Sequence, residues 1–101
     1  LALAYQLDGK LAAQWGTHTH VQTADEQILP KGTGYLTDLG MTGPVHSVIG
    51  VKPEQSIANF RGELTSRYEV APGPCMLTGA VFTYDAAAKR CTGAERVRIL
   101  D

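Results

Sequence analysis

Two histidines placed two residues apart are the part of this sequence best suited to chemistry. His18 and His20 lie in the run Gly-Thr-His-Thr-His over residues 16–20. Neutral imidazole is the commonest nitrogen ligand for transition metals. In an extended backbone alternate side chains project to the same side, so the pair could reach one metal ion or two adjacent ions. Gly16 allows the chain to turn sharply just before them. The spacing is compatible with a metal site, but two histidines spaced in this way are more often solvated loop residues.

A two-metal centre needs more ligands than two imidazoles. The only other histidine is His46, in a glycine-rich segment. Asp25 and Glu26 follow the pair, but two carboxylates at the start of a strand are more often a solvated edge or a turn partner. Asp38 is expected to close a strand and to accept backbone N–H bonds in an Asx turn. The remaining ligands are therefore expected from residues outside these 101.

Apolar periodicity and turn residues predict the elements that would position the pair. The expected helices span residues 1–7 and 53–64, and the expected strands span 11–15, 28–29, 35–39, 67–71, 76–84 and 95–100. The strand at 11–15 is expected to be buried and to lead into a loop over 17–23.

The helix predicted over residues 53–64 has Ile57, Phe60 and Leu64 at helical spacing, so this face is expected to pack on a sheet. Ser56 and Asn59 would then face solvent. Replacing a buried Phe60 by alanine would cost roughly 3–5 kcal/mol.

Length and composition indicate one folded unit. The chain has 101 residues, of which 44% are hydrophobic, and nine basic side chains balance ten acidic ones without any run of like charge. Nothing in this balance favours nucleic acid or an anionic membrane as a partner. No apolar stretch approaches the roughly 20 residues that span a bilayer, so a soluble cytoplasmic protein is expected. The start at Leu1, within a helical pattern, indicates a fragment.

The two cysteines, Cys75 and Cys91, are expected to be unpaired. A hairpin turn over residues 85–90 is centred well past their midpoint, so they would not face each other. Disulfides are also uncommon in proteins that show no sign of secretion.

Three runs of sequence, in order, resemble a known family. They are GTHTHVQTADE over residues 16–26, TDLGMTGP over 37–44 and SVIG over 47–50. Together they resemble the C-terminal part of the YmdB-type calcineurin-like metallophosphoesterases, which are similar in activity to cyclic-nucleotide phosphodiesterases. The resemblance runs through nearly the whole chain. It implies an α/β fold in which residues 1–101 form the C-terminal segment of one four-layer α/β/β/α sandwich domain with two mixed sheets, the N-terminal part being absent.

The resemblance also implies the chemistry of the site. Two divalent or mixed-valence metal ions, iron or manganese, would be bound, with His18 on one and His20 on the other. The family's other ligands and its general-acid histidine would precede this segment. The implied substrate is a small phosphodiester or cyclic nucleotide. Thr42, Gly43 and His46 are candidates for substrate contacts, although His46 replaces the acidic residue expected there.

Two alternatives from other classes stay open at this point. One is a non-catalytic interaction or assembly module that kept the sequence and lost the chemistry; assembly into a homo-oligomer is also open. The other is a structural zinc site, which is disfavoured because neither cysteine forms a ligand pair with a histidine.

Overall fold

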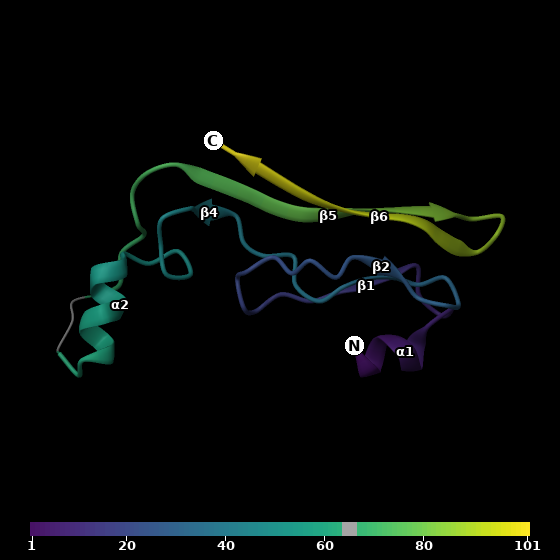
Figure 1. The fold of residues 1–101 in the computed structure, drawn as a ribbon, viewed down its shortest axis with the longest axis horizontal. Helices are drawn as coiled ribbons and strands as arrows, with labels where there is room; N and C mark the ends of the chain where they lie inside the picture. The colour runs from purple at the N-terminus through teal and green to yellow at the C-terminus, as the bar shows by residue number, and fades with distance from the viewer. Residues whose placement is uncertain (64–66) are drawn as a thin grey trace.

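The computed structural model describes residues 1–63 and 67–101. Its elements are α1 (Ala2–Leu7), β1 (Ala13–Trp15), β2 (Gln27–Ile28), β3 (Gly34–Leu36), β4 (Gly43–Pro44), α2 (Pro53–Phe60), β5 (Cys75–Asp85) and β6 (Arg90–Leu100). They form two three-stranded sheets, ordered β1-β3-β2 and β4-β5-β6. The long β5–β6 hairpin lies along one side of the molecule, with the small first sheet beneath it and α2 at one end (Figure 1). The α/β class with two sheets is confirmed.

The first sheet is small and mixed. β1 pairs with β3 in parallel and β2 pairs with β3 antiparallel, which confirms the predicted hairpin. Its first strand is shifted by one residue from 28–29, and its second is shorter than the predicted 35–39. β3 is fully buried, whereas the expected burial of the first strand is wrong, since Trp15 is 54% exposed. At Gly34 a Cβ atom would lie 2.6 Å from the Phe82 ring and 2.9 Å from Cys91 Sγ. The absence of a side chain there lets this sheet pack closely against the hairpin.

Helix α1 docks on the first sheet through one small residue. Ala4 is completely buried and forms the core cluster with Leu29 and Tyr35. Below the helix, the Asp8 carboxylate accepts hydrogen bonds from the backbone N–H groups of Lys31 and Thr33. Burial raises the pKa of Asp8, but these hydrogen bonds outweigh it and hold the pKa below its ordinary value. Asp8 thus ends the predicted helix and ties it to the β2–β3 turn.

The second sheet is dominated by the β5–β6 hairpin, which extends further toward its turn than predicted, to the pair Asp85–Arg90. Asp85 accepts hydrogen bonds from the N–H groups of Ala87 and Ala88 and so closes its turn. Cys91 lies opposite Tyr84, and Cys75 lies opposite Pro44 on β4. Both cysteines are free thiols, as predicted.

The prediction for the second helix is wrong in its packing. α2 ends at Phe60, and Leu64 lies outside the described residues. Phe60 is 91% exposed and Ile57 50% exposed, whereas Ser56, expected toward solvent, is more buried than either. The helix contributes no buried residue, so nothing in this chain supports the predicted cost of Phe60→Ala.

Helix α2 is held by polar contacts at its start rather than by an apolar face. Gln55 receives a hydrogen bond from the Glu69 N–H and donates to the Arg67 carbonyl, and Lys52 forms an ion pair with Glu69. The strand predicted at 67–71 is reduced to an isolated bridge between Val51 and Val70. No helix in the described part of the chain is long and apolar enough to cross a membrane.

Candidate metal-binding loop

The loop with the two histidines starts where β1 and β3 end side by side. Gly16 donates its N–H to the Leu36 carbonyl at 3.3 Å and accepts the Leu39 N–H at 2.9 Å. These bonds continue the parallel pairing by one step before the chain leaves the sheet. Carboxyl ends of neighbouring parallel strands are a common place for ligand sites, because the loops that leave them converge there.

Gly16 is required by close backbone approach. A Cβ atom at this position would overlap the carbonyl oxygen of Thr37, which is main chain and cannot swing away. We therefore expect Gly16→Ala to lower the free energy of unfolding by about 1–3 kcal/mol. Gly79→Ala is the matched control, since a Cβ atom there would have no neighbour within 4 Å. Chemical denaturation of both variants would test this, and equal midpoints would contradict it.

The backbone at the two histidines is not extended, which corrects the sequence-based expectation. His18 has φ of 102° and His20 has φ of 66°, both in the left-handed region that non-glycine residues rarely occupy. Each such residue costs on the order of 1–3 kcal/mol and persists only where its surroundings impose it. Conformations of this kind concentrate at functional sites, so the strain supports a binding role for this loop.

Asp38 imposes the loop conformation. The side chain is 1% exposed, and its Oδ2 accepts hydrogen bonds from Thr19, at 2.9 Å from the backbone N–H and at 2.6 Å from the hydroxyl. Its Oδ1 accepts the Gly40 N–H at 2.8 Å, which confirms the predicted Asx-type turn. Burial raises the pKa of Asp38, but the bonds from Thr19 and Gly40 and the nearby His20 keep it below its ordinary value. A carboxylate at Asp38 thus fixes the residue between the two histidines.

The carboxylates just after the histidines serve structure. Asp25 accepts hydrogen bonds from the Thr23 hydroxyl at 2.6 Å and from the Thr37 N–H at 3.1 Å, and also binds the Thr37 hydroxyl. Glu26 forms an ion pair with Arg96, with 2.9 Å between Oε2 and Nε. These contacts agree with the interpretation of Asp25 and Glu26 as turn and edge residues.

The donor atoms of the two histidines suit a metal, but they do not complete a site. His18 is exposed and His20 is half-buried, and Nδ1 of His20 is buried without a hydrogen-bond partner. A buried imidazole nitrogen without a partner is costly unless something binds it. Within the described ranges no group of three or more His, Cys, Asp or Glu side chains could hold a metal ion. A metal bound by these two histidines would therefore need further ligands beyond the described residues.

Of the three residues predicted to contact substrate, the structure brings two to the histidine loop. A cavity of about 520 Å³ is lined by Thr42, Gly43 and His20 together with apolar side chains, among them Met41, Ile49 and Val51. His46 is exposed and does not line this cavity. The predicted contact by His46 thus has no support from its position.

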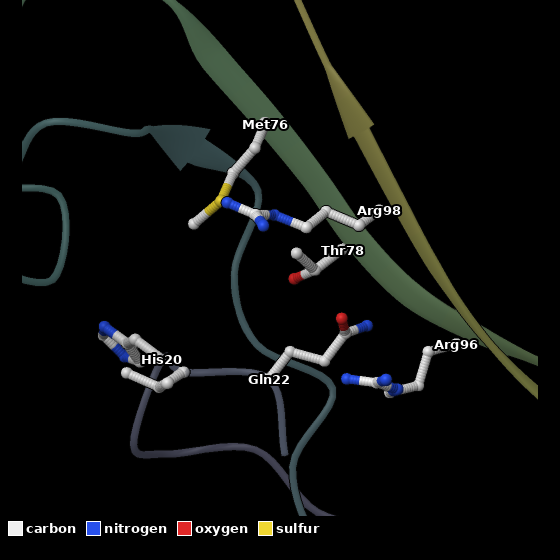
Figure 2. A pocket seen from close by; sticks show the side chains of 7 residues that line it. His20, Gln22, Met76, Thr78, Arg96 and Arg98 are labelled. Carbon is white, nitrogen blue, oxygen red and sulfur yellow. The ribbon is translucent and has the colours of Figure 1, made fainter. Parts of the chain in front are cut away.

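A second cavity beside His20 was missed from the sequence. It has a volume of about 310 Å³ and is lined by His20, Val21, Gln22, Met76, Thr78, Arg96 and Arg98 (Figure 2). Four of these residues belong to the β5–β6 hairpin, more than 50 positions away in the chain. Only the alternation of Arg96 and Arg98 on one strand face could have drawn attention to them.

Comparison with known proteins agrees with this architecture. The family model of the YmdB-like proteins matches residues 1–97. The chain is 48% identical over 101 residues to a 2',3'-cyclic-nucleotide 2'-phosphodiesterase of Bacillus subtilis (strain 168), covering all of this chain and 38% of the relative. It is 42% identical over 101 residues to a putative phosphatase/phosphodiesterase of Mycoplasma pneumoniae, covering 99% of this chain and 36% of that protein.

Two solved structures are similar at a TM-score of 0.90. One is a hypothetical protein from Thermus thermophilus, 37% identical, with 99% of this chain and 39% of that chain covered. The other is a novel phosphatase from Mycoplasma pneumoniae, 42% identical, with 98% and 36% covered. This chain thus spans less than two-fifths of the length of these relatives. The predicted resemblance is confirmed, and the chain belongs to the family of YmdB-like proteins.

Proposed function

We propose that this chain is the C-terminal part of one metallophosphoesterase domain that hydrolyses small phosphodiesters, cyclic nucleotides among them. His18 would bind one of two metal ions and His20 the other, with iron or manganese as the metals. The remaining ligands and the general-acid histidine would lie in the preceding part of the protein. The activities for which the Bacillus and Mycoplasma relatives are named support this assignment.

The observation that carries the proposal is the strained and anchored histidine loop. Two non-glycine residues in left-handed conformations flank Thr19, which Asp38 holds through its backbone and its hydroxyl. Backbone strain of this kind clusters at ligand-binding sites, so it supports a bound ligand here. The partnerless Nδ1 of His20 supports the same conclusion.

In this proposal the imidazole nitrogens of His18 and His20 donate electron pairs to the metals, and Asp38 holds the loop that positions them. Two bound metal ions would supply the chemistry of water activation, phosphate orientation and charge neutralisation. The two imidazoles must be neutral to offer their nitrogens, so acid is expected to weaken the site. Asp38 fixes the loop through the hydrogen bonds that its carboxylate accepts from Thr19 and Gly40.

A comparison of this chain with the full-length protein tests the proposal. With manganese present, the full-length protein should hydrolyse 2',3'-cyclic nucleotides and a chromogenic phosphodiester. These 101 residues alone should hydrolyse neither, because two imidazoles cannot hold a two-metal cluster. Turnover by the isolated chain comparable with that of the full-length protein would contradict the division of ligands, and an inactive, metal-free full-length protein would contradict the function.

A further inference from the structure

The cavity between the histidine loop and the β5–β6 hairpin indicates a further binding residue, an inference that rests on the proposed function. Arg96 and Arg98 occupy alternate positions of β6 and lie opposite Ala80 and Thr78 of β5. They therefore belong to the same face of the hairpin. Figure 2 shows both guanidinium groups directed toward the cavity that His20 and Gln22 close from the other side.

Hydrogen bonds connect the histidine loop to the β5–β6 hairpin and hold the two at a fixed distance. The Gln22 side-chain amide donates hydrogen bonds to the carbonyls of Gly79 at 2.9 Å and Val97 at 3.0 Å. These acceptors belong to β5 and β6, and the donor follows His20 by two residues. Arg98, one residue beyond Val97, is thereby held beside the histidine loop.

Most polar side chains around this cavity are already engaged. Gln22 binds the two carbonyls, the Thr78 hydroxyl donates to the Met41 carbonyl at 2.8 Å, and Arg96 pairs with Glu26. Arg98 has no ion-pair partner among residues 1–63 and 67–101. Among the described side chains that line the cavity, Arg98 is thus an exposed cation without a protein partner. His20 belongs to the same lining, and its buried Nδ1 also has no hydrogen-bond partner.

We propose that Arg98 binds the non-bridging oxygens of the phosphate group of a substrate or product held at the histidine loop. A guanidinium is planar and always charged, and it presents paired N–H donors that match phosphate oxygens. The positive charge on the hairpin and the imidazole on the loop face one cavity of about 310 Å³, which is large enough for a phosphate group. Arg98 is therefore a residue for anion recognition and not a metal ligand.

The test uses Arg98→Gln and Arg98→Lys in the full-length, manganese-loaded protein. Inorganic phosphate is the probe in isothermal titration, and a 2',3'-cyclic nucleotide is the substrate. Arg98→Gln should weaken phosphate binding and raise KM by about tenfold, as expected for a lost charge-assisted hydrogen bond, with metal content and melting temperature unchanged. Arg98→Lys should recover part of the loss. Arg61→Gln, an exposed arginine at the end of α2, is the control and should match the parent.

The outcomes separate this assignment from the proposed function. Unchanged phosphate affinity and KM in Arg98→Gln would overturn the role of Arg98 while leaving the phosphodiesterase intact. Metal loss in Arg98→Gln would overturn it as well, because the role would then be structural. If the parent binds phosphate in an Arg98-dependent manner but hydrolyses no phosphodiester, the anion site stands and the proposed function fails. A parent that binds no phosphate overturns the assignment.

Discussion

His20→Ala in the full-length protein is expected to lose bound metal and most phosphodiesterase activity while keeping its fold. The side chain is half-buried, its Nδ1 has no partner in the described chain, and it contributes nothing to the cluster of Ala4, Leu29 and Tyr35. Removing partners that only orient a metal ligand already changes affinity or activity about 10–100-fold. Loss of a direct ligand should therefore lower activity by at least about 100-fold. Stability should fall only by the lost metal linkage.

Metal analysis, an activity assay and circular dichroism on the same preparation measure these effects. His18→Ala should behave in the same way. His46→Ala is the matched control, because His46 is exposed and lies outside the cavities that His20 lines, so both metals should be retained. Full activity and two metals per chain in either loop variant would refute the assignment. A loop variant that fails to fold would make the histidines structural, and metal loss in His46→Ala would mean that the site is misplaced.

Asp38→Asn is expected to destabilise the protein by about 1–3 kcal/mol and to loosen the histidine loop. The two carboxylate oxygens accept the N–H groups of Thr19 and Gly40 on opposite sides. An amide has one oxygen and one NH₂ group, so either orientation places a donor against one of these backbone N–H groups and leaves that N–H without its acceptor. Because Thr19 lies between the two histidines, metal affinity should fall with stability.

The pH dependence of the Asp38 contribution follows from the direction of its pKa shift. The pKa of the folded protein is below the ordinary value, so the stabilisation is complete above the unfolded pKa of about 3.9 and is lost as pH falls through the folded pKa. Asp38→Asn should remove this acid-sensitive component. Asp85→Asn, at the exposed hairpin turn, is the control. Denaturation curves of both variants between pH 3 and 7 would measure how the free energy of unfolding depends on pH. The same pH dependence in both variants would contradict the role of Asp38.

Local patterns in the sequence predicted most of the elements but not their packing. The helix at 1–7 and the turn at 85–90 follow from apolar spacing and from side chains that bind their own neighbourhood, and both are present. The apolar spacing of α2 is equally regular, yet Phe60 is exposed. Periodicity identifies a face that could be buried, but it does not say whether this chain supplies the surface that would cover it.

The candidate site shows the same division. The His-x-His spacing is visible in the sequence, and the Asx turn at Asp38 was predicted from its local sequence and is confirmed. The roles of His18 and His20 as metal ligands remain a prediction. The bond from Asp38 to Thr19 spans 19 residues, and the approach of Arg98 to His20 spans 78, so no local pattern encodes them. The left-handed conformations were missed because non-glycine residues rarely adopt positive φ, and the Asp38 side chain that holds this loop is distant in the sequence.

Metal binding by His18 and His20 is tested most directly by anomalous diffraction from crystals of the manganese-loaded full-length protein. We predict two metal peaks, one at bonding distance from an imidazole nitrogen of His18 and the other from His20, at about 2.0–2.2 Å as for nitrogen ligands generally. Peaks bound only by other residues, with both imidazoles outside bonding distance, would contradict it.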